Sequence, residues 1–247
     1  LTNSDEFAFT GVRSLKMHAM PVSPEGGKVY LYKQTHYQPK DFHNSRYDPC
    51  FSPVLYPGQT IHGAAYIPAY SSPAYVRLYA REQRTGEEFL GERVLLETGR
   101  WHEMSFKLPA LPGGLLDEAG FMFEMCGEHG MRPQDFTAFV DDLYWDGKPN
   151  YSVEFRNETT EFWNGLHQEV SQFTKVKGLM YLEDGQLNLS CSDFAEAYTG
   201  RYDWTDYQAQ FALTPVVGGH NMVNVRVQGA IRSYAVCLHE GGKLCLM

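Results

Sequence analysis

Hydrophobic and polar residues alternate along most of this chain, which is the period-two pattern of half-buried β-strands. The clearest example is the stretch 223–228, Val-Asn-Val-Arg-Val-Gln, where three valines face one side and three polar residues face the other. Helical spacing is nowhere sustained, so the pattern predicts an all-β protein. The other strands are expected at 15–19, 28–33, 60–67, 75–81, 103–108, 120–126, 139–145, 207–213, 233–239 and 243–247.

Turn signals divide these strands into two modules. The strand 139–145 stops at the turn-forming sequence Asp-Gly-Lys-Pro-Asn of 146–150. About eight strands precede this turn, which is the number found in a jelly roll. About six strands follow it, and the last of them, 243–247, ends without a partner and leaves backbone groups unpaired. We therefore expect two antiparallel β-sandwich modules, a jelly roll over 1–149 and a second sandwich over 150–247 that is incomplete at its C-terminal end.

The charge balance argues against nucleic acid as a partner. The 30 acidic residues outnumber the 21 basic ones, for a formal net charge of -9, and such a surface repels phosphate backbones. The chain has no run of about 18 apolar residues and no signal-peptide pattern at its start, so a membrane partner is not expected either.

Cysteine, histidine, serine and glycine carry no familiar catalytic motif. The five cysteines show no CxxC spacing, and we interpret them as reduced thiols, which favours a cytoplasmic location. The nine histidines form no HExxH and no His-x-His, so we expect surface or hydrogen-bonded roles for them. GxSxG, GxGxxG and GxxxxGK(S/T) are absent, so acyl transfer and nucleotide binding lack their usual signatures.

The stretch 41–53 is a candidate ligand-binding loop. It is polar, aromatic and interrupted by prolines, and it is too long for a tight hairpin. We expect Asp41, Arg46, Tyr47 and Asp48 to contact a ligand. Asp41 and Asp48 could also act as the acid and base of a glycosidase, which needs two carboxylates about 5 to 9.5 Å apart. The structural alternative is that Arg46 pairs with a carboxylate and Tyr47 packs on the sandwich edge.

Two adjacent aspartates lie in the strand that closes the first module. Because neighbouring residues of a strand point to opposite faces, Asp141 and Asp142 are expected to diverge. Ca²⁺ prefers several hard oxygen ligands, often including carboxylates, so one of the two could hold a structural Ca²⁺. The alternative is that this aspartate only caps the turn.

Aromatic residues supply a possible carbohydrate site. Sugar rings present apolar C–H faces, and an exposed aromatic ring beside polar groups can bind them. An all-β core of this size also needs buried aromatic residues. The candidates are Tyr66, Tyr70, Tyr75, Tyr79, Trp163, Tyr202, Trp204 and Tyr207.

Several short motifs follow one another in a recognisable order. Those of the first module are Asp-Phe at 41–42, Ser-Arg-Tyr-Asp-Pro at 45–49, Phe-Ser-Pro at 51–53, Tyr-Pro-Gly-Gln at 56–59 and Val-Asp-Asp-Leu-Tyr-Trp-Asp-Gly at 140–147. Those of the second are Phe162-Trp163, Gly-Gln-Leu at 185–187, Trp-Thr-Asp-Tyr at 204–207 and Val-Arg-Val-Gln-Gly at 225–229. The first set resembles the accessory region C-terminal to the catalytic domain of large bacterial ADP-ribosylglycohydrolase family proteins. The second set resembles a second accessory module of the same proteins, similar to a concanavalin-like sandwich.

The resemblance implies a galactose-binding-like jelly roll without catalytic residues, because no helical segment is present to match the family's hydrolase domain. It also implies that Asp141 is the position that binds structural Ca²⁺ in such modules. The acidic opening strand that usually completes that calcium site is missing from this sequence.

These features predict a non-catalytic region that binds a glycan or a neighbouring catalytic domain, with Asp41, Arg46, Tyr47, Asp48 and Trp163 as ligand contacts and Asp141 as the metal ligand. One alternative is a glycoside-acting enzyme whose site forms at the module junction from Asp48, Asp141 and Glu124. A second alternative is a structural spacer, which requires the aromatic residues to be buried and no concave patch to remain.

Overall fold

The computed structural model describes residues 1–20, 26–36, 53–83, 85–112, 115–126, 136–157, 161–163, 167–170, 173–228 and 232–247. The chain forms two compact units, Leu1–Thr199 and Gly200–Met247. Strands are the main regular secondary structure of both units, and the described residues contain only two short 3-10 helices, η1 (Phe155–Asn157) and η2 (Glu240–Gly242), so the all-β prediction is confirmed. No described helix has the length and apolar character needed to cross a membrane. The expected module boundary at residue 149 lies inside the first unit and stays a prediction.

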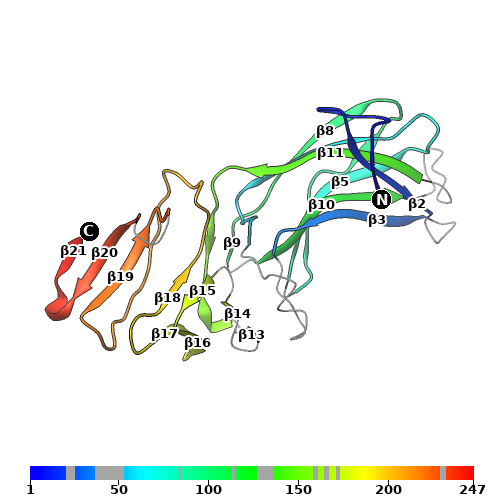
Figure 1. Ribbon diagram of the computed structural model, residues 1–247. Helices are drawn as coiled ribbons and strands as arrows, with labels where there is room; N and C mark the ends of the chain where they lie inside the picture. Colours follow the sequence, from blue (N-terminus) through cyan, green and yellow to red (C-terminus); the bar gives the residue numbers. More distant parts are fainter. Residues whose placement is uncertain are drawn as a thin grey trace. The chain divides into compact units, whose positions relative to one another are not determined.

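Two five-stranded sheets form a sandwich in the first unit, and Figure 1 shows them as two layers. All strand pairs within these two sheets are antiparallel. The first sheet has the order β1 (Thr2–Ser4), β2 (Ser14–Ala19), β11 (Phe136–Asp146), β4 (Thr60–Tyr66) and β8 (Trp101–Lys107). The second has the order β3 (Gly27–Gln34), β10 (Leu116–Met125), β5 (Ala74–Glu82) and β6 (Glu88–Leu90), with β7 (Val94–Leu96) also paired to β5.

The hydrophobic core lies between these two sheets. The alternating apolar residues of β4, β5, β10 and β11 enter it, as the period-two pattern requires. Phe123 of the second sheet packs against Phe136 of the first, with ring centroids 5.4 Å apart. Phe121 occupies the space beside Gly63, where an added Cβ would lie 2.4 Å from the ring Cζ. The absence of a side chain at Gly63 therefore lets the two sheets approach at this point.

Smaller sheets complete the described part of the first unit. The structure pairs β9 (Leu111–Pro112) with β12 (Tyr151–Ser152) in parallel. The remaining pairs are antiparallel, in a four-stranded and a two-stranded sheet. The four-stranded sheet has the order β13 (Glu161–Trp163), β14 (His167–Val170), β15 (Phe173–Lys177) and β18 (Glu196–Tyr198). The two-stranded sheet pairs β16 (Leu179–Glu183) with β17 (Gln186–Ser190).

The described part of the second unit contains one antiparallel sheet, β19 (His220–Val225), β20 (Tyr234–His239) and β21 (Leu244–Leu246). The strand expected at 223–228 ends earlier, because Arg226 has a left-handed φ of 53°. The strand expected at 207–213 is wrong: these residues pair with no described strand, and Phe211 and Leu213 are about half exposed. Alternation alone does not make a strand when no neighbouring strand supplies hydrogen bonds.

Residues 5–13, which we call the N-terminal strap, lie against the outer face of the first sheet. Phe7 packs on Tyr66 and Phe139, with ring centroids 4.5 and 5.0 Å apart, and Phe9 packs on Trp101 at 5.6 Å. These rings project from β4, β8 and β11 on the side opposite the core. The strap therefore covers aromatic surface that the first sheet would otherwise expose.

Two carboxylates of β11 hold this strap. The Asp141 Oδ2 atom accepts hydrogen bonds from the backbone N–H groups of Phe9 and Thr10, at 3.0 and 3.2 Å. The Thr10 hydroxyl donates to the Asp142 Oδ1 atom at 2.7 Å. The expectation that the two aspartates diverge is wrong, because a bulge interrupts the pairing of β11 with β4 here and Asp142 has a φ of 50°. The extra residue turns both carboxylates toward Thr10.

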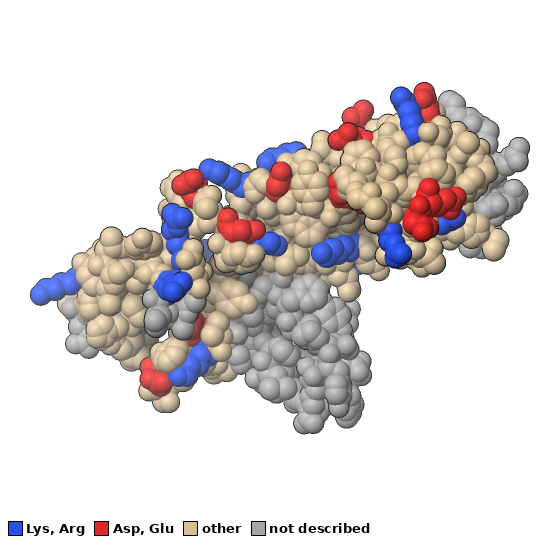
Figure 2. Space-filling view, turned by 45° about the horizontal axis from the view of Figure 1, so that its top comes forward, with Lys and Arg blue, Asp and Glu red and all other residues tan. Residues whose placement is uncertain are grey.

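On the face shown in Figure 2, the charged side chains of the described residues are not segregated by sign. Figure 2 shows Lys and Arg interspersed with Asp and Glu on the visible face. A broad basic area of the kind that binds a phosphate backbone does not occur among the described residues of this face.

We expect Gly63→Ala to destabilise the sandwich by about 1 to 3 kcal/mol, because the new methyl group overpacks the core against Phe121. Urea denaturation measures the free energy of unfolding. The second variant, Phe121→Leu, removes the ring atom that the methyl group meets. If the double variant is destabilised by the full sum of the two single variants, the proposed contact does not limit packing at this position.

We expect Asp141→Ala to release the strap and to lower the free energy of unfolding by about 1 to 2 kcal/mol, since two backbone donors lose a charged acceptor. Hydrogen exchange at Phe9 and Thr10 reports the release directly. Asp146→Ala, on the same strand, is the matched control, because its exposed pair with His62 contributes less than about 1 kcal/mol. Unchanged exchange at Phe9 and Thr10 in Asp141→Ala would contradict the anchoring role.

Candidate functional site

The outer face of the second sheet carries an unusual concentration of tyrosine, arginine and glutamate side chains. On β5, the core takes Val76 and Leu78, so the residues between them face outward. The same alternation applies to β3 and β10, whose registers with each other and with β5 place the outward residues side by side. We call this surface the tyrosine–arginine face; it consists of Tyr30, Tyr32, Tyr75, Arg77, Tyr79, Arg81, Glu118, Met122 and Glu124.

One end of the tyrosine–arginine face is an ion-pair network around Glu118, which is 5% exposed. Arg81 Nη2 lies 2.9 Å from a Glu118 carboxylate oxygen and 3.3 Å from an oxygen of Asp117. The Tyr79 hydroxyl donates to Glu118 at 3.1 Å. Burial raises the pKa of the Glu118 carboxyl, while the positive charge of Arg81 opposes that rise. Burial also raises the pKa of the Tyr79 hydroxyl, which keeps it a hydrogen-bond donor.

A second network lies around Glu124 and Arg93. The Arg93 guanidinium donates two hydrogen bonds to the Glu124 carboxylate, at 3.2 and 3.0 Å. Its central carbon lies 3.4 Å from the ring centroid of Tyr75, a cation–π contact. The hydrogen bond to Glu124 raises the pKa of Arg93. This bidentate, stacked arrangement fixes the orientation of all three side chains.

Arg77 and the two tyrosines of β3 lie between these networks. Arg77 is flanked on β5 by Tyr75 and Tyr79, and Met122 is its partner on β10. The Arg77 Nε atom is buried and has no hydrogen-bond partner among the described residues. The same register puts Met122 opposite Tyr30 of β3. A buried guanidinium donor without an acceptor is costly. Arg77 as a whole is partly exposed, so a ligand that reorients its side chain could supply an acceptor.

The tyrosines offer surface for an apolar ligand face. Tyr30 packs edge-on against Tyr79, with ring centroids 5.2 Å apart, and its hydroxyl faces Glu88 at 3.4 Å. Tyr32 is 51% exposed. The face thus combines an accessible aromatic ring with an arginine and carboxylates that are held in place by their neighbours.

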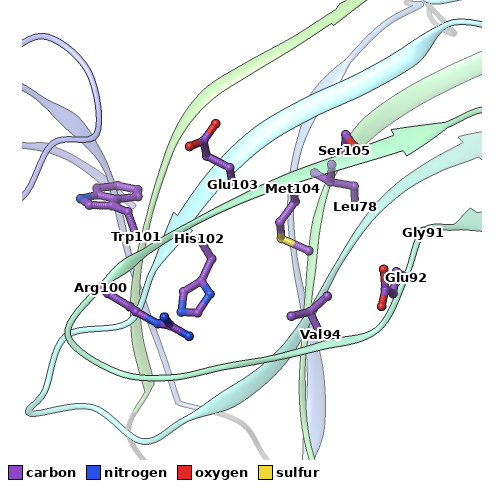
Figure 3. Close-up of a pocket in the computed structure, with 10 residues that line it drawn as sticks. All are labelled: Leu78, Gly91, Glu92, Val94, Arg100, Trp101, His102, Glu103, Met104 and Ser105. Atoms are coloured by element: carbon purple, nitrogen blue, oxygen red, sulfur yellow. The ribbon is translucent and has the colours of Figure 1, made fainter.

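A shallow pocket opens at the edge of the sandwich, between β8 and the segment that joins β6 to β7 (Figure 3). Its volume is about 450 Å³, and it includes Leu78, on the strand that carries Arg77. Figure 3 shows Met104 and Val94 in its wall, with Arg100 and His102 at one end. Both polar groups at that end already contact Glu97: Arg100 pairs with its carboxylate at 2.9 Å, and His102 Nε2 lies 3.2 Å from its carbonyl oxygen.

The loop residues expected from the sequence, Asp41, Arg46, Tyr47 and Asp48, lie outside the described residues, and their roles stay predictions. Trp163 lies in β13, and its side chain is outside the described part.

The predicted metal position, Asp141, accepts three backbone hydrogen bonds: two from the strap at Oδ2 and one from its neighbour Asp142 at Oδ1. Calcium binding at Asp141 stays a prediction.

The carboxylates named for the enzyme alternative do not converge where the structure describes them. Asp141 faces outward from the first sheet, since Val140 beside it enters the core. Glu124 faces outward from the second sheet, since Phe123 enters the core. The two are therefore on opposite sides of the sandwich, and each already has hydrogen-bond donors.

The aromatic candidates divide between core-like and exposed positions. Tyr66 and Tyr79 are buried, whereas Tyr70 and Tyr202 are mostly exposed. Sequence reasoning missed Tyr30 and Tyr32. The signal that would have found them is the alternation of 28–33, which puts both tyrosines on the face opposite Val29 and Leu31.

This chain shows only limited similarity to known proteins. The sequence matches no protein-family model and no curated protein. One similar solved structure is a carbohydrate-binding module of the β-sandwich superfamily, with 18% identity and a TM-score of 0.40 over 59% of this chain and 52% of that chain. Another is a family 16 carbohydrate-binding module, with 12% identity and a TM-score of 0.30 over 59% of this chain and 84% of that chain. This chain thus matches about half the length of the first structure. At these scores, neither likeness transfers a ligand or a site.

Proposed function

We propose that the N-terminal sandwich is a non-catalytic carbohydrate-binding module and that its ligand lies on the tyrosine–arginine face. The observation that carries this proposal is Arg77, which is partly exposed and whose buried Nε donor has no described partner. Tyr32, on the same face, is half exposed. A sugar satisfies both groups, because its hydroxyl and ring oxygens accept hydrogen bonds and its C–H face packs on an aromatic ring.

Preorganisation supports binding of a weakly interacting ligand such as a sugar. The side chains of Tyr75 and Tyr79 are held by the Arg93–Glu124 and Arg81–Glu118 networks. A face that is ordered before binding loses less side-chain entropy when the ligand arrives. Planar rings and fixed polar groups then supply affinity that mobile side chains would not.

The outer face of the first sheet is a poorer candidate. Phe7 and Phe9 of the strap already cover its aromatic rings. The spacer alternative is also weakened, because Tyr32 is half exposed instead of buried.

We extend the proposal to the setting that the sequence resemblance implies, an accessory region beside a hydrolase of the ADP-ribosylglycohydrolase type. The further ligand contacts in this setting are the loop residues Asp41, Arg46, Tyr47 and Asp48, and Trp163 in the second module. These roles rest on the motif order and on residue chemistry alone. Tyr47→Ala, measured by affinity electrophoresis in gels that contain a polysaccharide, tests the loop separately from the sheet.

The test of binding uses affinity electrophoresis of the whole chain through gels that contain soluble β-glucan, mannan or xylan. We expect at least one polysaccharide to retard the wild-type chain. Tyr32→Ala and Arg77→Ala should each weaken that interaction by about tenfold or more, equivalent to about 1.4 kcal/mol, because each removes a separate ligand contact.

The matched control is Tyr144→Ala, since Tyr144 has the same 51% exposure as Tyr32 but lies on the first sheet, stacked on His62. Circular dichroism verifies that each variant is folded. Retardation that survives in both Tyr32→Ala and Arg77→Ala, or that disappears equally in Tyr144→Ala, would place the binding elsewhere. Absence of retardation by every polysaccharide tested would count against carbohydrate as the ligand class.

A further inference from the structure

Three metal-ligating side chains meet on one face of the sheet in the second unit. Cys237 and His239 are two residues apart on β20, so they point to the same face. Cys245 of β21 is the direct cross-strand partner of Cys237. The two sulfur atoms and the imidazole nitrogen all lie within 4.8 Å of one another, and His239 Nε2 is 3.0 Å from Cys245 Sγ.

A fourth possible ligand lies beside them. His220 of β19 is the direct partner of His239 across the other edge of β20, so it shares the same face. The two imidazole centroids are 4.8 Å apart, with the rings nearly perpendicular. The antiparallel register therefore brings two cysteines and two histidines from three strands to one patch.

These distances suit a tetrahedral ion. Zn–S and Zn–N bonds of about 2.3 and 2.0 Å place tetrahedral ligand atoms roughly 3.5 to 3.8 Å apart. The ligand atoms of the cluster lie 3.0 to 4.8 Å apart, which is within about 1 Å of these values. Two thiolates and one or two imidazoles are the donor set that zinc favours over harder cations.

The second unit also has little else to hold it together. Only Ala235 and Cys237 are buried hydrophobic residues among the described residues of Gly200–Met247. Units of this size usually need disulfides, a metal or an oligomeric partner, because their cores are too small. Cys237 is 0% exposed and lies on the central strand of the sheet. A metal bound by Cys237, His239 and Cys245 would crosslink β20 to β21, and His220 as a fourth ligand would add β19.

We infer that Cys237, His239 and Cys245 form a structural zinc site, with His220 or a water molecule as the fourth ligand, and that this ion stabilises the second unit. The site is independent of the tyrosine–arginine face. The alternative to a zinc site is a disulfide between Cys237 and Cys245, because these two cysteines are direct partners on neighbouring strands. Both cysteines are free thiols in the structure.

The test measures zinc content and cobalt spectra of the whole chain, purified under reducing conditions and desalted after incubation with Zn²⁺ or Co²⁺. We expect about one ion per chain, with thiolate-to-cobalt charge-transfer bands and the intense ligand-field bands of tetrahedral Co²⁺. Removal of zinc with a chelator should lower the melting temperature, because metal bound only to the folded unit stabilises it.

Cys245→Ser and His239→Ala should each lose the ion or the tetrahedral spectrum, whereas Cys191→Ser, a change at an exposed thiol, should retain both. Because variants in a small unit can unfold, the spectrum and chelation response of the wild-type chain stand as a second, independent readout. Wild-type chain that binds no ion under reducing conditions overturns the inference. Retention of the ion by Cys245→Ser would also contradict the inference. A Cys237–Cys245 disulfide in native protein that persists with excess Zn²⁺ would contradict it too.

Discussion

The packing of large aromatic side chains between two sheets determines what the N-terminal sandwich can present to solvent. Phe121 occupies the space left by Gly63, and Phe123 contacts Phe136 of the opposite sheet. Because side chains alternate along a strand, fixing these residues inside fixes their neighbours outside. Met122 and Glu124 therefore face outward beside Arg77 and Tyr75 of β5. The tyrosine–arginine face is a consequence of the core.

The two outer faces of the sandwich differ in how far other parts of the chain cover them. The first is covered by the strap, whose backbone donors are satisfied by Asp141 and whose Phe7 ring packs on Tyr66. On the second, Tyr32 is half exposed and the ion pairs hold the other polar groups in place. This asymmetry gives one sheet a structural role on its outer side and leaves the other suited to a ligand. The bulge in β11 adds to the anchoring of the strap, since a regular strand would turn Asp142 away from Thr10.

The alternation pattern predicted the strands of the sandwich well, because burial of one face in a large core imposes a strict period of two. The same pattern failed at 207–213, where no partner strand is present. The bulge at Asp142 cannot be predicted from the sequence pattern, since a left-handed residue in a strand has no periodic signature. Alternation along the sequence places Tyr30 and Tyr32 on one side of β3, and Arg77 and Tyr79 on one side of β5. Only the strand register shows that these residues share one face of the sheet. The cysteine and histidine cluster is likewise formed by pairing across strands, and no spacing along the chain reveals it.

We propose that carbohydrate binds to the outer face of the second sheet and not to the strap-covered face of the first. Backbone amide chemical shifts recorded during titration with an oligosaccharide fragment of the bound polysaccharide test it most directly. The predicted result is a set of saturable shifts centred on Tyr32, Arg77 and Met122, with the amides of Phe9 and Thr10 in the strap unchanged. Shifts confined to the strap and β11, with none around Arg77, would contradict the account.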